Sequence, residues 1–481
     1  MFKRIFLAFI FTCLILNLNS QTLNVKVIDS ITELPIAYSN IYFSNNTGLI
    51  TDESGNFELI KSQLSQNDSI YISMMGYNKR SFYINDFNDT IIKLIQKPIK
   101  LSEVFLSNKK LSSEEIISKV IENIENNYEN GFTKNKIYLS RKSNTSTEKF
   151  IIDKFKSTVP EINKSLIDSL LSNLKKDNNS GLETLAYYYK NLDAKVQKIR
   201  IIKSRETYNK DGEVLESINK KMEEAFKNEL KADSYFKIKS GIFGGDLDVQ
   251  GLEEIDTTNI ESVKKFQEKE IKEKDDFANN QISTINRLYN TLFFEKGSYL
   301  NFILKPNKYI FLESKIDILG NDLVYTIEVE PKGRGKYSGT LYINPDDFAI
   351  VRIDFKNIKP IYNLKLLGVF VNIYHRDGKI ILSKYENDKY NLSYAKINFG
   401  QRVGFDRPIK LIEKNKNVKG RRKQNEISFK MDMVSDIKSI IELQVFESKK
   451  ISKDKFENLK NKNDVMPEYL DEFITNFWEE F

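Results

Sequence analysis

Short alternating segments near the start of this chain constrain its fold more than any other feature. Apolar and polar residues alternate at 23–27, 41–43 and 57–59, and a turn signal at 52–55 separates two of these segments. A period of two residues is typical of half-buried strands. Regular spacing of such strands is typical of a sandwich. Residues 21–98 are therefore predicted to form a seven-stranded β-sandwich.

The first 20 residues have the pattern of a secretory signal peptide. Lys3 and Arg4 precede a mostly apolar run of about a dozen residues, which ends near Ser20. A membrane-spanning helix needs roughly 20 apolar residues, so this run is too short to be one. Cys13 lies in the middle of the run, whereas a lipidated cysteine would end it. Cleavage before Gln21 is favoured over lipidation at Cys13 and over an uncleaved, buried first helix.

The residue composition narrows the chemistry that the chain can perform. Cys13 is the one cysteine, so a cleaved chain has no thiol for catalysis or zinc binding. His375 is the one histidine, which disfavours a Ser-His-Asp mechanism. Basic residues number 74 against 67 acidic ones, for a net charge of +7, which indicates a mixed surface and no nucleic-acid partner. No later apolar run is long enough for a transmembrane helix.

Four motifs in the N-terminal segment resemble a known domain family. They are Val25-Lys-Val-Ile-Asp, Leu34-Pro-Ile-Ala, Thr51-Asp-Glu-Ser-Gly-Asn-Phe57 and Met75-Gly-Tyr77. In this order they resemble the carboxypeptidase-regulatory-like domain, a prealbumin-type β-sandwich widespread in exported envelope proteins of Bacteroidota. The resemblance implies an accessory module without catalytic residues. Asp52, Glu53 and Asp68 are accordingly interpreted as turn and surface acids rather than catalytic groups.

The middle of the chain, residues 99–290, is predicted to mix helices and strands. Ser112-Ser-Glu-Glu115 is a capping box that begins a helix, and Gly131 is a plausible stop. Further helices are predicted within 160–181, 214–230 and 257–288. The apolar stripe of the first helix consists of Ile117, Val120, Ile121, Ile124 and Tyr128.

Two segments of this region are candidates for ligand binding. Tyr187-Tyr-Tyr189 is either a stacking platform for carbohydrate or bases or, as favoured, part of a half-buried strand. Gly244-Gly-Asp246 lacks the spacing of a phosphate loop, so a turn between two strands is favoured there.

Residues 291–436 are predicted to form a curved antiparallel sheet. Strands are expected at 299–304, 309–319, 323–329, 337–343, 348–355, 362–374 and 380–385, with turns at 344–347 and 376–379. This stretch resembles the paired strands in curved sheets of lipoprotein-carrier-like periplasmic proteins. It also resembles the conserved body attached to the regulatory-like module in Bacteroidota. Both resemblances imply a fold and no active site.

The C-terminal half offers few candidate site residues. His375 is interpreted as a surface residue at the end of a strand rather than a ligand or base. Asp346 and Asp347 are interpreted as turn residues rather than an acid pair. The basic loop 414–423 and an amphipathic segment at 473–481, within a helical tail predicted over 437–481, are candidates for peripheral membrane contact. A solvated loop and docking on the body are the favoured interpretations.

The sequence therefore predicts a mainly β protein, α+β overall, with no catalytic, cofactor-binding or metal-binding residue and no cofactor. We expect a non-enzymatic exported protein, periplasmic or outer-membrane-associated, that binds, scaffolds or carries an unidentified envelope protein or lipid. The alternatives are a carboxylate-dependent hydrolase of peptide or glycan and an accessory component of an outer-membrane receptor or transport system. A concave sheet with a lipid-sized cavity would favour a carrier, whereas paired buried carboxylates in one cleft would favour a hydrolase.

Overall fold

The computed structural model describes most of residues 22–470. It leaves out 37–38, 44–47, 52–53, 61–64, 66–67, 75–76, 96–110, 173–175, 192–196, 208–233, 242, 248–259, 320–321, 386–387, 416–422 and 460–462. The predicted signal peptide, the helix predicted at 214–230, most of the basic loop and the 473–481 segment lie outside the described residues.

The N-terminal unit is a sandwich of seven strands in two sheets, as predicted. The strands are β1 (Thr22–Asp29), β2 (Asn40–Phe43), β3 (Gly48–Ile50), β4 (Asn56–Ile60), β5 (Ser69–Ser73), β6 (Arg80–Tyr83) and β7 (Ile91–Leu94). One sheet has the order β4-β1-β7 and the other β3-β2-β5-β6. Alternate residues such as Val25 and Val27 of β1 face Ile70 and Ile72 of β5 in a common core. Gly55 adopts the positive φ of 76° that its turn requires.

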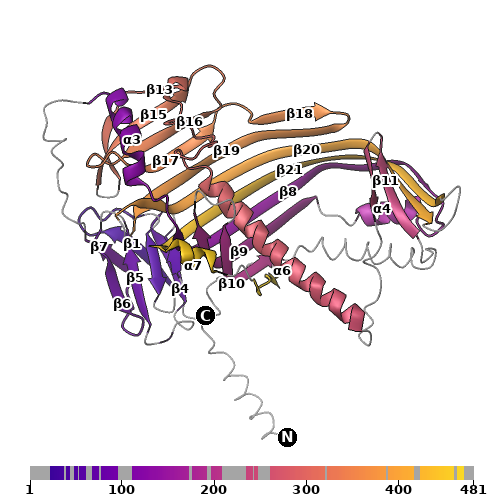
Figure 1. The fold of residues 1–481 in the computed structure, drawn as a ribbon, viewed down its shortest axis with the longest axis horizontal. Helices are drawn as coiled ribbons and strands as arrows, with labels where there is room; N and C mark the ends of the chain where they lie inside the picture. Colours follow the sequence, from indigo (N-terminus) through magenta and orange to yellow (C-terminus); the bar gives the residue numbers. More distant parts are fainter. Residues whose placement is uncertain are drawn as a thin grey trace, which may run out of the picture.

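A single sheet of 15 strands takes up most of the remaining described chain (Figure 1). Its strands are β8 (Thr133–Ser157), β9 (Asp177–Lys190), β10 (Lys198–Thr207), β11 (Ser234–Ser240), β12 (Phe243–Leu247), β13 (Tyr309–Phe311), β14 (Lys315–Leu319), β15 (Asp322–Pro331), β16 (Tyr337–Ile343), β17 (Ile350–Asn357), β18 (Tyr362–Leu366), β19 (Val369–Lys384), β20 (Tyr390–Asn415), β21 (Lys423–Lys450) and β22 (Glu468–Leu470). The main order is β13-β15-β16-β17-β19-β20-β21-β8-β9-β10-β22. β14 pairs with β15, β18 with β19, and β11 with both β12 and β20.

This sheet includes residues before and after the predicted range of 291–436. Strands β8, β9 and β10 of the middle region belong to it, because β8 pairs with β21 along most of its length. β21 continues to Lys450, so residues 437–450 are strand and the helical tail predicted there is wrong. The short helix α7 (Lys453–Glu457) and β22 follow instead. The described protein is mainly β, as predicted.

Several local predictions within the sheet are wrong. The strand predicted at 309–319 is two strands, β13 and β14. Residues 299–304 form no strand, although Leu300 and Phe302 are fully buried in the core. Residues 362–374 form a hairpin of β18 and the start of β19, which turns at Gly368 with a φ of 78°. The turn predicted at 376–379 lies inside β19, where Gly378 pairs with Ile397 of β20.

The helices are α3 (Ser113–Asn127), α4 (Lys164–Ser172), α6 (Ile260–Tyr289), α7 and the 3-10 helix η3 (Pro306–Lys308). Helices α3, α4 and α6 follow the predicted local signals with shorter or shifted bounds, whereas no helix was predicted at η3. α4 ends before the predicted 181 because residues from Asp177 onward join the sheet as β9. In the part of the chain that is described, no helix is both long and apolar enough to cross a membrane.

Helix α3 begins at the predicted capping box. The Glu115 N–H donates to the Ser112 side chain at 3.2 Å, and the Ser112 N–H donates to the Glu115 carboxylate at 2.8 Å. The helix ends before Gly131, because Tyr128 is already extended. Ile121 is 42% exposed, so the predicted stripe is wrong at this position, and Ile116 is buried instead.

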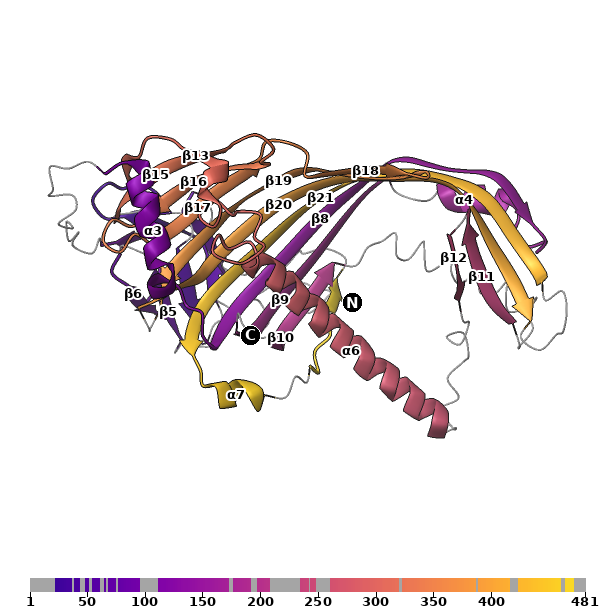
Figure 2. The ribbon, with the colours of Figure 1, turned by 45° about the horizontal axis from the view of Figure 1, so that its top comes forward.

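Helices α3 and α6 pack on the same face of the sheet and form the main core with it. Ile116 of α3 and Ile285 of α6 join Ile380, Ala395 and Leu443 of the sheet in one buried cluster. Beyond this core, the long strands β8, β20 and β21 continue with no described helix above them and bend over (Figure 2). At the far end, α4 packs on the sheet through Ile167 in a second, smaller cluster.

Candidate apolar binding surface

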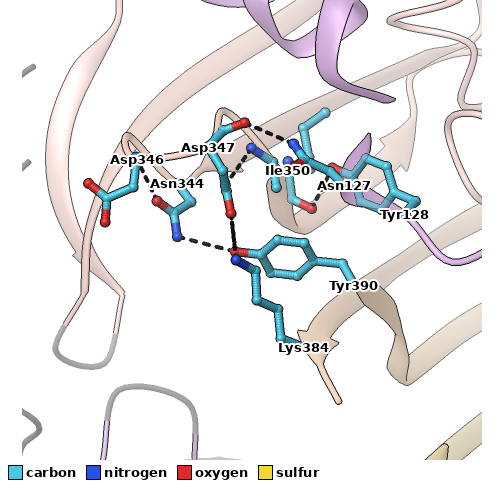
Figure 3. Close-up of polar contacts among 9 residues, drawn as sticks. Asn127, Tyr128, Asn344, Asp346, Asp347, Ile350, Lys384 and Tyr390 are labelled. Atoms are coloured by element: carbon cyan, nitrogen blue, oxygen red, sulfur yellow. Dashed lines mark hydrogen bonds and ion pairs between the residues drawn. The ribbon is translucent and has the colours of Figure 1, made fainter. Parts of the chain in front are cut away.

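Asp346 and Asp347, the two acids predicted to lie in a turn, make polar contacts with neighbouring residues (Figure 3). The Asp346 N–H donates to Asn344 Oδ1 at 2.8 Å, which closes the turn between β16 and β17. Asp347 Oδ2 accepts the Tyr390 hydroxyl at 3.1 Å and lies 2.9 Å from Lys384 Nζ. Burial and the Asp347 charge raise the pKa of Tyr390 far above 10, so this phenol remains a neutral donor.

The same turn anchors the end of α3. Asn127 Nδ2 donates to the Asp347 carbonyl at 2.8 Å. The buried Tyr128 hydroxyl accepts the Ile350 N–H at 2.6 Å and donates to the Ile350 carbonyl at 3.1 Å. These contacts join helix, turn and sheet, so Asp346 and Asp347 have a structural role as turn residues.

The other candidate residues also have local partners. His375 is about half exposed and its Nε2 lies 2.5 Å from Asp377 Oδ2. It lies within β19 at a β-bulge, so the predicted position at a strand end is wrong. The Asp68 carboxylate accepts the Ser65 N–H at 3.0 Å in a turn. Asp52 and Glu53 lie outside the described residues.

The tyrosine and glycine segments belong to strands. Tyr188 and Tyr189 of β9 are buried, and Tyr188 stacks on Tyr289 of α6 with ring centroids 5.7 Å apart. Gly244 lies within β12 opposite Lys239, so the turn predicted there is wrong. Across the described ranges, no group of three or more His, Cys, Asp and Glu residues is placed to hold a metal ion.

A row of apolar side chains crosses five adjacent strands of the bent part of the sheet. Along the row, Leu366 of β18, Val369 of β19, Phe405 of β20, Met433 of β21 and Phe150 of β8 are each directly opposite the next. Residues directly opposite each other in an antiparallel sheet point to the same face. The five side chains therefore lie on one face, which we call the inner surface.

Two neighbouring rows extend the inner surface. The next row adds Leu364, Val371 and Val403, and the row beyond it adds Tyr362, Ile373 and Ile437. These apolar side chains are not buried. Leu366 is 58% exposed, Tyr362 47% and Leu364 40%. The others are partly exposed.

The inner surface lies between two parts of the same face that helices cover. Phe405 lies ten positions after Ala395 in β20, with no shift in the pairing of β20 to β21 between them. They therefore point the same way, and Ala395 lies in the core beneath α3 and α6. In the other direction, Leu411 packs with Phe429 in the cluster that α4 covers. Figure 2 shows the sheet arched over this face.

The opposite face of the same strands is charged. Lys149 of β8 pairs with Asp432 of β21, and Lys430 lies 2.7 Å from Asp406 of β20. Asp432 lies between Met431 and Met433, which point to the inner surface. Ion-paired residues alternate with methionines in β21, whereas Phe370 of β19 and Ile151 of β8 are apolar residues on the face opposite the inner surface.

Arginines border the inner surface at both ends. Arg376 lies toward the core, with its guanidinium 4.9 Å from the centroid of the Tyr299 ring. Arg407 lies toward α4 and donates to the Leu367 carbonyl and to Ser240 Oγ, each at 2.9 Å. The arrangement offers an apolar area for a hydrocarbon chain, with Arg376 at one border and the buried, hydrogen-bonded Arg407 at the other.

Comparisons with known proteins give one family match and several distant structures. The family model of the CarboxypepD_reg-like domain matches residues 25–106. No curated protein matches the chain. Among solved structures, an outer membrane lipoprotein-sorting protein domain from Vibrio parahaemolyticus has a TM-score of 0.22 and 10% identity, covering 72% of this chain and 97% of that chain.

Two further structures are more distant still. The MucA/MucB complex of Pseudomonas aeruginosa has a TM-score of 0.16 and 5% identity, covering 68% of this chain and 93% of that chain. A membrane-associated protein of unknown function from Bacteroides fragilis has a TM-score of 0.12 and 8% identity, covering 88% of this chain and 97% of that chain. TM-scores this low establish no common fold. The family match at residues 25–106 agrees with the motifs of the N-terminal segment and with its seven described strands, so this segment contains a CarboxypepD_reg-like domain.

Proposed function

We propose that this chain is a non-catalytic protein of the bacterial cell envelope that binds the apolar part of a lipid on its inner surface. The observation that carries the proposal is the uncovered apolar row from Leu366 to Phe150. At about 4.8 Å between neighbouring strands, five strands span roughly 20 Å, which suits an extended acyl chain. Large contiguous apolar patches on a protein surface are characteristic of binding sites.

Other features support the envelope location and the lack of catalysis. The first 20 residues have a signal-peptide pattern, and the CarboxypepD_reg-like domain is an accessory module. The carboxylates of Asp347 and Asp377 contact neighbouring side chains of the fold, so they give the hydrolase alternative no support. The N-terminal sandwich contacts the charged face of the sheet, where Gln444 Nε2 donates to Asn40 Oδ1 at 2.7 Å. Among the described residues, this placement leaves the inner surface open to a ligand.

Replacing Met433 with lysine is expected to weaken lipid binding at least tenfold. Met433 lies in the apolar row between Phe405 and Phe150, and the new ammonium group would lose water when an acyl chain covers it. The measurement is a fluorescence titration of the purified chain with dansyl-labelled undecanoic acid.

The matched control is Val434→Lys. Val434 is the next residue of β21 and points to the charged face, opposite Gly404 and Lys149. This variant should bind the probe as the wild-type chain does. The proposal is wrong if the wild-type chain does not bind the probe, or if the two lysine variants weaken binding equally.

A further inference from the structure

Strand β18 forms an exposed edge of the bent sheet. It pairs with β19 on one side, without a register shift, and no other described strand pairs with it. All five of its residues are exposed. Unpaired N–H and C=O groups along such an edge are a template for another strand. The usual protections are sparse here, since β18 has no proline and a single charged residue, Lys365.

The sequence of β18 is complementary to itself in an antiparallel arrangement. If two copies pair with Leu364 opposite Leu364, then Tyr362 of each copy lies opposite Leu366 of the other. Asn363 then lies opposite Lys365, so no like charges meet. Cross-strand pairs of aromatic and aliphatic side chains stabilise a sheet, whereas directly opposed like charges destabilise it. A pairing centred on Lys365 would oppose two lysines.

Strand β14, a comparable edge elsewhere in the sheet, has the opposite pattern. It pairs with β15 only, and Ile316 and Ile318 are 59% and 64% exposed. Its central residue is Asp317, so self-pairing of β14 about its centre would oppose two carboxylates. Exposure alone is therefore not what favours β18. Its charge pattern fits a second copy, and that of β14 does not.

We propose that two copies of this chain associate through β18, antiparallel and centred on Leu364, to form a twofold dimer with one continuous sheet. A twofold axis perpendicular to the sheet keeps both inner surfaces on the same side, because opposed residues share a face. The apolar rows that contain Tyr362, Leu364 and Leu366 then continue from one copy into the other. The dimer does not depend on lipid binding, since the β18 backbone and its five side chains are sufficient to define it.

Leu364→Lys is expected to weaken dimerisation at least tenfold, because it places two lysines opposite each other at the centre of the pairing. The measurement is sedimentation equilibrium of the full chain over a concentration series, with circular dichroism to verify folding. Ile316→Lys makes the same change on the exposed edge β14 and should leave the dimer intact. A monomeric wild-type chain up to about 100 μM would overturn the proposal, as would equal effects of the two variants.

A cysteine pair tests the register without disturbing the sheet. In a Cys13→Ser background, Leu364→Cys should cross-link to itself under mild oxidation, because opposed Cβ atoms in an antiparallel pair lie about 4.5–5.5 Å apart, near disulfide range. Leu366→Cys is the control, since its partner is Tyr362 of the other copy. Cross-linking at residue 366 and not at 364 would exclude this pairing, and so would cross-linking at neither position.

Discussion

Replacing Arg205 with methionine is expected to destabilise the fold by about 3–5 kcal/mol, the range for breaking a buried ion pair from one side. Arg205 Nε donates to Glu183 Oε2 at 2.7 Å between β10 and β9, and the two side chains are only 5% and 9% exposed. The Glu183 carboxylate also accepts the Tyr138 hydroxyl of β8 at 2.5 Å. Without the guanidinium, the Glu183 carboxyl group loses its ion-pair partner in a site that water scarcely reaches.

The free energy of unfolding, measured by urea denaturation at pH 7, tests this prediction. The control is Arg352→Met, because Arg352 pairs with Asp354 at 2.5 Å but the two side chains are 21% and 31% exposed. Solvent screens that pair, so its loss should have an effect of about 1 kcal/mol or less. If the two substitutions lower the free energy of unfolding equally, burial does not determine how much the Glu183–Arg205 pair contributes to stability.

The features that could be predicted from the sequence are those that depend on neighbouring residues. Gly55 follows an acidic turn opener, and a turn with positive φ forms there. Ser112 and Glu115 have the spacing of a capping box, and both of its hydrogen bonds are present. Strands β1, β2 and β4 of the sandwich were predictable for the same reason, since each has its own alternation of apolar and polar residues.

The continuity of the large sheet could not be predicted, because it depends on residues far apart in the sequence. In the sequence, Lys149 of β8 is simply a charged residue in a polar stretch. Its ion-pair partner, Asp432 of β21, becomes its neighbour only when the two strands pair in the folded sheet. The inner surface has the same origin. Phe405 and Met433 form one apolar row only in the register that the structure reveals. Alternation within a single strand, such as Val369, Val371 and Ile373, gives no indication of which face is covered.

Gly378 explains why a turn was wrongly predicted at 376–379. Asp377-Gly378 is a typical turn pair in sequence. In the structure, Gly378 lies mid-strand where an added Cβ would be 2.4 Å from the Lys396 carbonyl and 2.9 Å from the Phe355 ring. The glycine is required by a close approach of neighbouring groups and not by a positive φ. Sequence patterns cannot separate these two causes, because both select the same residue.

A buried lysine in the main core lowers the free energy of unfolding at neutral pH. Lys190, at the end of β9, is 1% exposed, and its Nζ has no hydrogen-bond partner among the described residues. It lies 4.5 Å from the centroid of the Tyr289 ring of α6. Burial lowers the pKa of Lys190 from 10.5 to about 8, although the charges of Glu295 and Glu129 act in the opposite direction.

Lys190→Met is therefore expected to stabilise the protein at pH 7 by about 3–4 kcal/mol, since the pKa is lowered from 10.5 to about 8 and one pKa unit corresponds to about 1.4 kcal/mol. Because the folded pKa is below the unfolded one, the unfolded wild-type chain binds more protons between pH 8 and pH 10.5. Wild-type stability consequently rises with pH across this window, and the advantage of the variant should shrink to near zero by its upper end. Urea denaturation at pH 7 and pH 10 measures both effects, with Lys142→Met at an exposed position of β8 as the control. A gain that is the same at both pH values would show that methionine acts through packing, and that the charge of Lys190 has no part in the difference.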